Sequence, residues 1–292
     1  MKQNSPPGTP ETINIHLTRS CNFACRFCYA GFRECASNRL STSALKQIIT
    51  LISGAAPLPD CRHRKINFAG GEPLLAPDLI DLVGFSRAQG LKTSIVTNGS
   101  LLTIPAINRL SSCLDILALS VDSGLIETNL ALGRSSRTFH PDADFYLTLA
   151  QRVRRTGIRL KINTVVSRPN LHEELGALIV RLAPFRWKVF QVKKVVGQND
   201  ADFDDLSITL PEFETFVAHN RQLTTEGTTL VPESADDMTA SYAMIAPNGC
   251  FFDSVHGHYR YSRPILKVGL EEAFRDVTFS PEKFMNRGGR YE

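Results

Sequence analysis

Six short apolar segments recur along the first two thirds of the chain, and each is followed by apolar residues at helical spacing. A repeat of strand and helix predicts a parallel sheet with right-handed crossovers. We expect strands over residues 12–17, 65–69, 91–96, 115–121, 158–166 and 187–192. Six units are two fewer than a closed TIM barrel contains. The sequence therefore predicts the α/β class, as an open, partial (βα)6 barrel of the TIM type.

The repeat stops near Lys194, and we divide the sequence there. Residues 12–194 are expected to form the partial barrel, and residues 195–292 an irregular C-terminal cap that closes the active site. Residues 1–11 are polar, contain three prolines and are expected to be flexible. Active sites of such barrels lie at the carboxyl ends of the strands, so candidate functional residues are sought in the loops that follow each strand.

Composition limits the possible partners and locations. The chain has 292 residues, of which 42% are hydrophobic and 21% charged, and its net charge is +4. So weak a positive charge suits a small anionic substrate and does not indicate nucleic acid. No apolar run approaches the length of a membrane span, and the N-terminus lacks the apolar core of a signal peptide. The absence of both segments, together with the odd number of cysteines, indicates a cytoplasmic protein without membrane association. We also expect the protein to be a monomer.

The first predicted strand is followed by Cys21, Cys25 and Cys28, with the spacing C-x3-C-x2-C. Three thiolates on one short loop can hold three irons of a 4Fe–4S cluster and leave the fourth iron open to another ligand. A zinc site is one alternative, but zinc usually takes four ligands in paired units, and no second Cys or His pair follows at matching spacing. Three buried core cysteines are the other alternative. The remaining cysteines are scattered: Cys35, Cys61, Cys113 and Cys250.

The cysteine spacing resembles the signature of radical S-adenosylmethionine (SAM) enzymes, in which the open iron chelates the amino and carboxylate groups of SAM. A second motif of this kind follows the second predicted strand, where Gly70 and Gly71 precede Glu72 and a proline. Two glycines let the backbone approach a ligand closely. Taken alone, this motif could equally well be an ordinary turn. Here it comes after a strand that itself follows the three cysteines, and in that position it resembles the motif with which radical SAM enzymes contact the SAM amine.

Three further residues are candidate SAM contacts. Asn98 ends the third predicted strand and Ser120 the fourth, although a turn residue such as Asn98 also has a purely structural explanation. Arg134 follows in a Gly-Arg turn. A loop arginine is usually just solvated, but a guanidinium pairs bidentately with carboxylates, and this one is suited to clamp the carboxylate of SAM.

Polar residues also occupy alternate positions in three of the predicted strands. Residues two apart in a strand point to the same side. If these side chains face outward they are solvated charges; if they face inward, burying the cations without an anion is very costly. Three such pairs in one barrel favour a pocket for a multiply charged anion such as a triphosphate. The pairs are Lys65 and Asn67, Lys161 and Asn163, and Arg186 and Lys188.

Several longer motifs resemble the viperin family of radical SAM enzymes, and the resemblance runs from about Ile13 to Glu292. The last two motifs lie outside the core that radical SAM proteins share, and so separate viperin from the others. The motifs are INFAGGEP at 66–73, SIVTNGS at 94–100, DILALS at 115–120, KIN at 161–163, RWKVFQ at 186–191, LVPES at 230–234 and NRGGRY at 286–291.

The resemblance implies an enzyme that converts a nucleoside triphosphate, such as CTP, UTP or GTP, to its 3′-deoxy-3′,4′-didehydro analogue. Such products terminate viral RNA synthesis, which implies a role in anti-phage defence. In this family one electron splits SAM, and the 5′-deoxyadenosyl radical takes the 4′ hydrogen of the ribose before the 3′ hydroxyl leaves as water. The residues implied in triphosphate binding are Lys65, Asn163, Arg186 and Lys188, with Lys161 nearby, and Tyr242 is placed near the ribose, where it is expected to supply the final hydrogen or proton.

The sequence departs from the family at two places. Ala69 stands where the family often has serine, which removes one phosphate hydrogen bond. The amphipathic N-terminal helix that anchors vertebrate viperin to membranes is absent, which suggests a soluble, prokaryotic-type member. The expected electron donor is a flavodoxin or ferredoxin. Two alternatives stay open: a radical SAM enzyme that acts on a peptide or another metabolite, and a non-catalytic iron–sulfur redox sensor.

Overall fold

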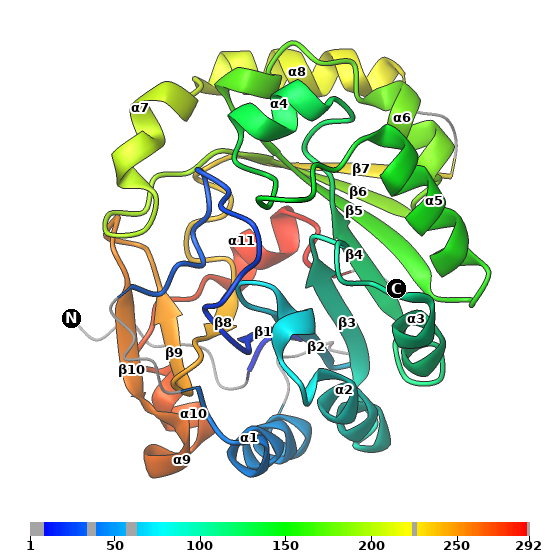
Figure 1. Cartoon of the computed structure of the whole chain (residues 1–292). Coiled ribbons are helices and arrows are strands. Elements are labelled where there is room, and N and C mark those ends of the chain that lie inside the picture. Colours follow the sequence, from blue (N-terminus) through cyan, green and yellow to red (C-terminus); the bar gives the residue numbers. More distant parts are fainter. Residues whose placement is uncertain (1–8, 34–38, 57–62, 224–226, 291–292) are drawn as a thin grey trace.

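The computed structural model describes residues 9–33, 39–56, 63–223 and 227–290, so that Cys35 and Cys61 lie outside the described residues. Its centre is one curved ten-stranded sheet in the order β10-β9-β8-β1-β2-β3-β4-β5-β6-β7 (Figure 1). The strands are β1 Thr12–His16, β2 Lys65–Ala69, β3 Lys92–Thr97, β4 Ile116–Ser120, β5 Arg159–Val166, β6 Arg186–Gln191, β7 Thr229–Glu233, β8 Ala243–Ile245, β9 Cys250–Asp253 and β10 Arg260–Pro264.

Strands β1 to β6 are the six predicted strands, each within a residue or two of its expected bounds, and they pair in parallel in chain order. The two edge strands, β10 and β7, are not paired with each other. The prediction of an open, partial α/β barrel is therefore confirmed.

Most of the helices cover the outer side of this sheet (Figure 1). The first begins where the Ser41 hydroxyl accepts a hydrogen bond from the Ala44 amide at 3.2 Å, as expected of a capping serine. The helices are α1 Thr42–Gly54, α2 Leu79–Ala88, α3 Ile104–Leu110, α4 Ile126–Ala131, α5 Ala143–Arg154, α6 Gly176–Leu182, α7 Phe203–Leu206, α8 Leu210–Gln222, α9 Ile265–Val268, α10 Leu270–Phe274 and α11 Pro281–Asn286, with short 3-10 turns at Pro73–Leu75, Arg168–Asn170 and Asp200–Asp202.

Alternation along the strands separates an apolar outer face from a polar inner face. In β1, Ile13 and Ile15 are fully buried in the main core between sheet and helices. Asn14 lies between them and points the other way, where its side-chain oxygen accepts a hydrogen bond from Asn67 of β2 at 2.8 Å. The hydrophobic core thus holds the sheet to its helices and leaves the opposite face for polar side chains.

The part after residue 194 is more regular than the irregular cap we predicted. Strand β7 extends the parallel sheet beside β6, β8 pairs in parallel with β1, and β9 and β10 follow as antiparallel strands. Two features hid these strands in the sequence: β7 contains Pro232, a residue that argues against a strand, and β8 is only three residues long. The C-terminal part therefore completes both edges of the barrel sheet.

The chain near its C-terminus crosses the amino-terminal ends of the inner strands, and α11 lies at the centre of the view in Figure 1. The Gly288 carbonyl accepts a hydrogen bond from Arg186 Nη2 at 2.5 Å, at the start of β6. Arg290 forms an ion pair of 3.0 Å with Glu11, directly before β1. This segment therefore links the starts of β1 and β6 at the amino-terminal ends of the strands.

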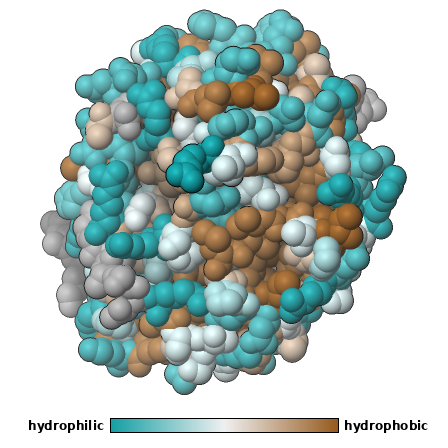
Figure 2. Space-filling model, in the orientation of Figure 1, coloured by the Kyte–Doolittle hydropathy of each residue, from teal (hydrophilic) through white to brown (hydrophobic). Residues whose placement is uncertain are grey.

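On the face shown in Figure 2, polar residues surround a broad apolar area near the centre of the view and a smaller apolar patch near the top. One apolar patch lies over α4, where Leu125, Ile126 and Leu130 are exposed. Within the described part of the chain, no helix is long and apolar enough to cross a membrane.

Candidate active site

The register of the sheet places all three predicted cationic pairs on its inner face. Asn67 lies beside Ser94, Ser94 beside Ile116, and Ile116 beside Arg159. Neighbours in register point to the same side of a sheet, and residues two apart do as well. Lys161, two residues after Arg159, therefore shares this face with Asn67.

The same register continues to β6. Lys161 lies beside Arg186, and Asn163 beside Lys188. The four cationic side chains are all buried, with exposed fractions of 4% for Lys65, 7% for Lys161, 5% for Arg186 and 3% for Lys188. Because buried cations are stable only where negative charge or acceptors face them, this face is suited to an anion.

Part of the positive charge is already compensated within the protein. Lys188 forms an ion pair with Glu233 of β7, a carboxylate with no solvent exposure. Arg287 approaches the same carboxylate at 3.3 Å. Burial favours the neutral carboxyl, but these two cations outweigh it and hold the pKa of Glu233 below its usual range. Two cations around one carboxylate leave one positive charge in excess at this point of the face.

Tyr242, the predicted catalytic residue, belongs to this cluster. Its phenol donates a hydrogen bond to Glu233 and lies 3.4 Å from Lys188 Nζ. The Arg287 guanidinium stacks over its ring, 3.6 Å from the centroid, a favourable cation–π geometry. Burial raises the pKa of Tyr242 well above 10, so the phenol stays protonated. The structure thus brings Tyr242 and Lys188 together.

The three cysteines lie in the loop that follows β1, at the carboxyl end of the sheet. Cys21 is exposed, Cys25 and Cys28 are half-buried, and all three are free thiols. Burial raises the pKa of Cys25 to about 12, and the nearby Arg134 cation opposes that shift. Burial also raises the pKa of Cys21 and of Cys28, and the Arg134 charge again opposes the shift. The positive charge of Arg134 therefore lies near all three thiols.

This donor set fits a 4Fe–4S cluster in kind and number, because three thiols stand on one loop beside a cation that favours their ionised form. Across the described ranges, no three Cys, His, Asp or Glu side chains converge closely enough to hold a metal ion. Binding a cluster would require the three thiols to release their protons.

The glycines after β2 permit a close approach of two loops. Gly70 has a φ of +150°, and a Cβ there would lie 2.6 Å from the Thr18 carbonyl oxygen. The Gly71 amide donates to that same carbonyl at 2.6 Å, and a Cβ at Gly71 would collide with the Ser20 backbone. The pair of glycines therefore seats the loop after β2 against the start of the cysteine loop.

Glu72 uses its side chain to join the ends of two strands. One carboxylate oxygen accepts from the Thr97 hydroxyl at 2.7 Å, and the other from the Asn98 amide at 2.9 Å. Burial raises the pKa of Glu72, and these hydrogen bonds oppose the shift. The Asn98 side chain in turn donates to Asn22 of the cysteine loop at 3.0 Å. These contacts tie the carboxyl ends of β2 and β3 to the cysteine loop.

Arg134 is held by a partner that the sequence did not indicate. Its Nε donates to the buried carboxylate of Asp122, which also accepts the Val165 amide at 2.7 Å. Ser120, the last residue of β4, is half-buried two residues before Asp122. The predicted SAM contacts other than Ser120 therefore gather around the cysteine loop, with Arg134 anchored by Asp122.

Sequence reasoning missed Glu233, Arg287 and Asp122 as members of the site. A signal was present for two of them, because Glu233 and Arg287 lie in the LVPES and NRGGRY motifs that carry the family resemblance. Their roles depend on contacts between residues 45 and 54 positions apart, which no local pattern reveals.

Comparison with known proteins agrees with this architecture. The model of the radical SAM superfamily matches residues 15–181. A structure described as native anSMEcpe with bound AdoMet has a TM-score of 0.70 at 14% identity, and the match covers 94% of this chain and 82% of that one. Streptococcus suis SuiB bound to S-adenosylmethionine gives 0.67 at 18% identity, with 97% and 69% covered. At such low identity these two likenesses show the fold alone.

Curated relatives are much more similar. The S-adenosylmethionine-dependent nucleotide dehydratase of Flammeovirga pacifica is 41% identical, over 96% of this chain and 95% of the relative. The S-adenosylmethionine-dependent nucleotide dehydratase RSAD2 of Danio rerio is 33% identical, over 98% of this chain and 79% of the relative. The chain therefore belongs to the radical SAM superfamily and, within it, to the viperin family of S-adenosylmethionine-dependent nucleotide dehydratases.

Proposed function

We propose that the chain is a SAM-dependent nucleotide dehydratase that removes water from a nucleoside triphosphate and yields its 3′-deoxy-3′,4′-didehydro analogue. The observation that carries the proposal is the inner face of the sheet, where Lys65, Lys161, Arg186 and Lys188 are all buried. Four buried cations suit the charge of a triphosphate, which a peptide substrate lacks. The names of the relatives support the same reaction.

The cofactor side of the proposal rests on the loops at the carboxyl ends of the strands. We propose that Cys21, Cys25 and Cys28 hold a 4Fe–4S cluster, with SAM bound beside the loop after β2 and near Asn98, Ser120 and Arg134. SAM bound to such a cluster supplies a 5′-deoxyadenosyl radical. Arg134 would remain fixed by Asp122, so its task is to place positive charge beside the cofactor in a fixed position.

On the substrate side, each residue has a positioning task. The cations would hold the phosphates near the amino-terminal half of the strands, which leaves the ribose toward the carboxyl ends, where the cysteine loop lies. Asn67 and Asn163 are half-buried on the same face and offer amide groups to the phosphates. Fixing the ribose in this way brings the reacting atoms together, which is the main contribution a protein makes to such chemistry.

Tyr242 is proposed to act next to the ribose as a proton or hydrogen donor. Its hydroxyl is protonated and directed by Glu233, so the phenol has one defined orientation. Glu233 also links this phenol to Lys188, a proposed phosphate ligand. Phosphate binding and the position of Tyr242 are therefore coupled through one carboxylate.

Residues 195–292 are proposed to close the active site, because they supply Glu233, Tyr242 and Arg287 to its inner wall. A cytoplasmic location, an anti-phage role, a monomeric state and an electron donor of the flavodoxin or ferredoxin class belong to the same proposal.

The test is the formation of 5′-deoxyadenosine by anaerobically reconstituted protein with SAM and a reductant. The proposal predicts that adding a nucleoside triphosphate increases 5′-deoxyadenosine and produces an equal amount of nucleotide lighter by one water. Formation that does not depend on any nucleotide would point to a peptide or other metabolite as substrate, and no formation at all would point to a redox sensor.

A further inference from the structure

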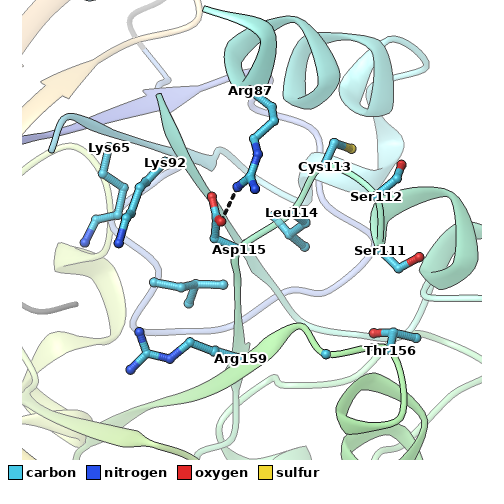
Figure 3. A pocket seen from close by; sticks show the side chains of 12 residues that line it. Lys65, Arg87, Lys92, Ser111, Ser112, Cys113, Leu114, Asp115, Thr156 and Arg159 are labelled. Atoms are coloured by element: carbon cyan, nitrogen blue, oxygen red, sulfur yellow. Dashed lines mark hydrogen bonds and ion pairs between the residues drawn. The ribbon is translucent and has the colours of Figure 1, made fainter. Parts of the chain in front are cut away.

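A hollow of about 280 Å³ lies at the opposite end of the strands from the cysteine loop. Its wall includes Lys65, Lys92, Ile116 and Arg159, which are the first residues of β2, β3, β4 and β5. Figure 3 shows Lys65 and Lys92 side by side, with Arg159 on the other side of the hollow. None of the tasks proposed above uses this hollow as a whole.

The hollow continues the inner face that carries the proposed phosphate ligands. Lys92 lies beside Lys65 in register, and Arg159 is two residues before Lys161 in the same strand. Their side chains therefore leave the sheet on its inner side, as Lys65 and Lys161 do. Lys65, which is only 4% exposed, belongs both to this face and to the wall of the hollow.

The charge of the wall is strongly positive. It contains Lys65, Arg87, Lys92 and Arg159, and Asp115 is the one carboxylate among the described residues that line it. Asp115 is already engaged: it pairs with Arg87, and its other oxygen accepts the Thr93 amide at 2.8 Å. Four cations against one carboxylate leave an excess of three positive charges around the hollow.

Two contacts hold cations of the wall in place. Arg87 is fixed by its ion pair with Asp115, and the Arg159 guanidinium stacks over the Phe185 ring at 3.9 Å from the centroid. Arginines held in this way lose little side-chain freedom when they bind an oxyanion. The wall is therefore arranged in advance for a small, multiply charged anion.

We propose that this hollow is a binding site for a phosphate group, with Lys92 and Arg159 as ligands and Lys65 shared with the inner face. The phosphate has two possible sources: the terminal phosphate of the nucleotide substrate, reaching down the inner face, or a free inorganic phosphate or pyrophosphate. The first source rests on the proposed function, and the second does not.

The test uses the full-length reconstituted protein and calorimetric titration with inorganic phosphate, pyrophosphate, a nucleoside triphosphate and the matching diphosphate. The variants are Lys92→Gln, Arg159→Gln and the double variant that carries both changes. Both side chains line the hollow from partly or fully exposed positions, and glutamine removes the charge but keeps most of the side-chain volume. The control is Lys267→Gln, which removes the same charge from exposed α9. Thermal unfolding verifies that each variant is folded.

The double variant is expected to bind pyrophosphate about five- to tenfold more weakly than the wild type, as expected for two partly exposed ion pairs, and Lys267→Gln to bind it unchanged. If the substrate supplies the phosphate, the double substitution weakens binding of the triphosphate more than binding of the diphosphate. If free phosphate is the ligand, pyrophosphate binding falls while triphosphate affinity stays.

Equal affinities for every phosphate ligand in the wild type, the double variant and Lys267→Gln would overturn the proposal. A wild type that binds pyrophosphate through these residues but binds no nucleoside triphosphate would leave the phosphate site standing and refute the proposed function.

Discussion

The phenol of Tyr242 donates a hydrogen bond to the carboxylate of Glu233, a side chain without solvent exposure. The same carboxylate pairs with Lys188, and Arg287 lies within 3.3 Å of it. Glu233 is thus the common partner of a proposed catalytic residue and a proposed phosphate ligand, and its charge holds two cations together in the barrel wall.

Replacing Glu233 by glutamine is expected to destabilise the fold. The change leaves Lys188 and Arg287 buried side by side without their counter-charge, and breaking a buried pair costs about 3–5 kcal/mol. Urea unfolding gives the free energy of unfolding. The matched control is Glu174→Gln, whose carboxylate is 69% exposed and whose loss should change stability by no more than about 0.5 kcal/mol. Equal, small losses in both variants would show that the Glu233 cluster contributes little.

Each of Cys21→Ala, Cys25→Ala and Cys28→Ala is expected to abolish cluster assembly, because a cluster with one open iron has no thiolate to spare. After anaerobic reconstitution, the variants should lack bound iron and the broad visible absorption of the wild type. Cys113→Ala, a half-buried cysteine outside the loop, should assemble the cluster normally. Normal iron content in any one of the three loop variants would exclude that cysteine as a ligand.

Arg186→Ala and Lys188→Ala are expected to weaken nucleoside triphosphate binding and to leave SAM binding intact. Removing one partner of a desolvated charge pair costs about 2–5 kcal/mol. These side chains come from the first half of β6, whereas the cysteine loop follows the carboxyl end of β1. Calorimetry with each ligand measures both affinities, with Lys267→Ala as the control for lost charge. Loss of both triphosphate and SAM binding would indicate a collapsed barrel. An unchanged triphosphate affinity would contradict the assignment of these residues as phosphate ligands.

Ala69→Ser is expected to be tolerated and to tighten triphosphate binding. Ala69 ends β2 on the same face as Lys65 and Asn67, so a hydroxyl there lies on the side of the sheet that carries the proposed phosphate ligands. One neutral hydrogen bond contributes about 0.5–1.5 kcal/mol, at most about a tenfold gain in affinity. Dissociation constants for the triphosphate and the monophosphate in both proteins measure the effect. An equal gain for the monophosphate would show that residue 69 does not face the distal phosphates.

Acid is expected to destabilise the protein through His16. This ring is 1% exposed and lies against Phe32 and Phe252 with centroid distances of 5.0 and 5.4 Å, and burial lowers its pKa from 6.5 to about 3. Folding therefore favours the neutral ring. The contribution of His16 to the free energy of unfolding is complete above pH 6.5 and is lost as the pH falls toward 3. The loss is at most about 1.4 kcal/mol per pH unit.

The measurement is the unfolding free energy of the wild type and His16→Phe between pH 8 and pH 4. The variant has no ionisable ring at this position, so its stability should fall less steeply below pH 6.5. The same slope in both proteins would assign the acid sensitivity to other groups.

The inner strands, and the position of each cationic pair on one side of its strand, were predictable because they depend on local alternation. The run from Arg186 to Gln191 displays two cations on one side whatever its neighbours are. The pairing of Lys188 with Glu233 was not predictable, since it depends on β7 lying beside β6, and Pro232 conceals β7. Likewise, the close packing of Gly70 and Gly71 against the start of the cysteine loop was not predictable, since it depends on a contact between two loops.

The most direct test of the account is the fate of the 4′ hydrogen of the nucleotide. The reconstituted protein would be supplied with SAM, a reductant and a nucleoside triphosphate that carries deuterium at the 4′ carbon, and 5′-deoxyadenosine would be analysed by mass spectrometry. The account predicts 5′-deoxyadenosine that has gained one deuterium, together with a nucleotide that has lost the deuterium and the 3′ hydroxyl. Unlabelled 5′-deoxyadenosine and unchanged nucleotide would contradict it.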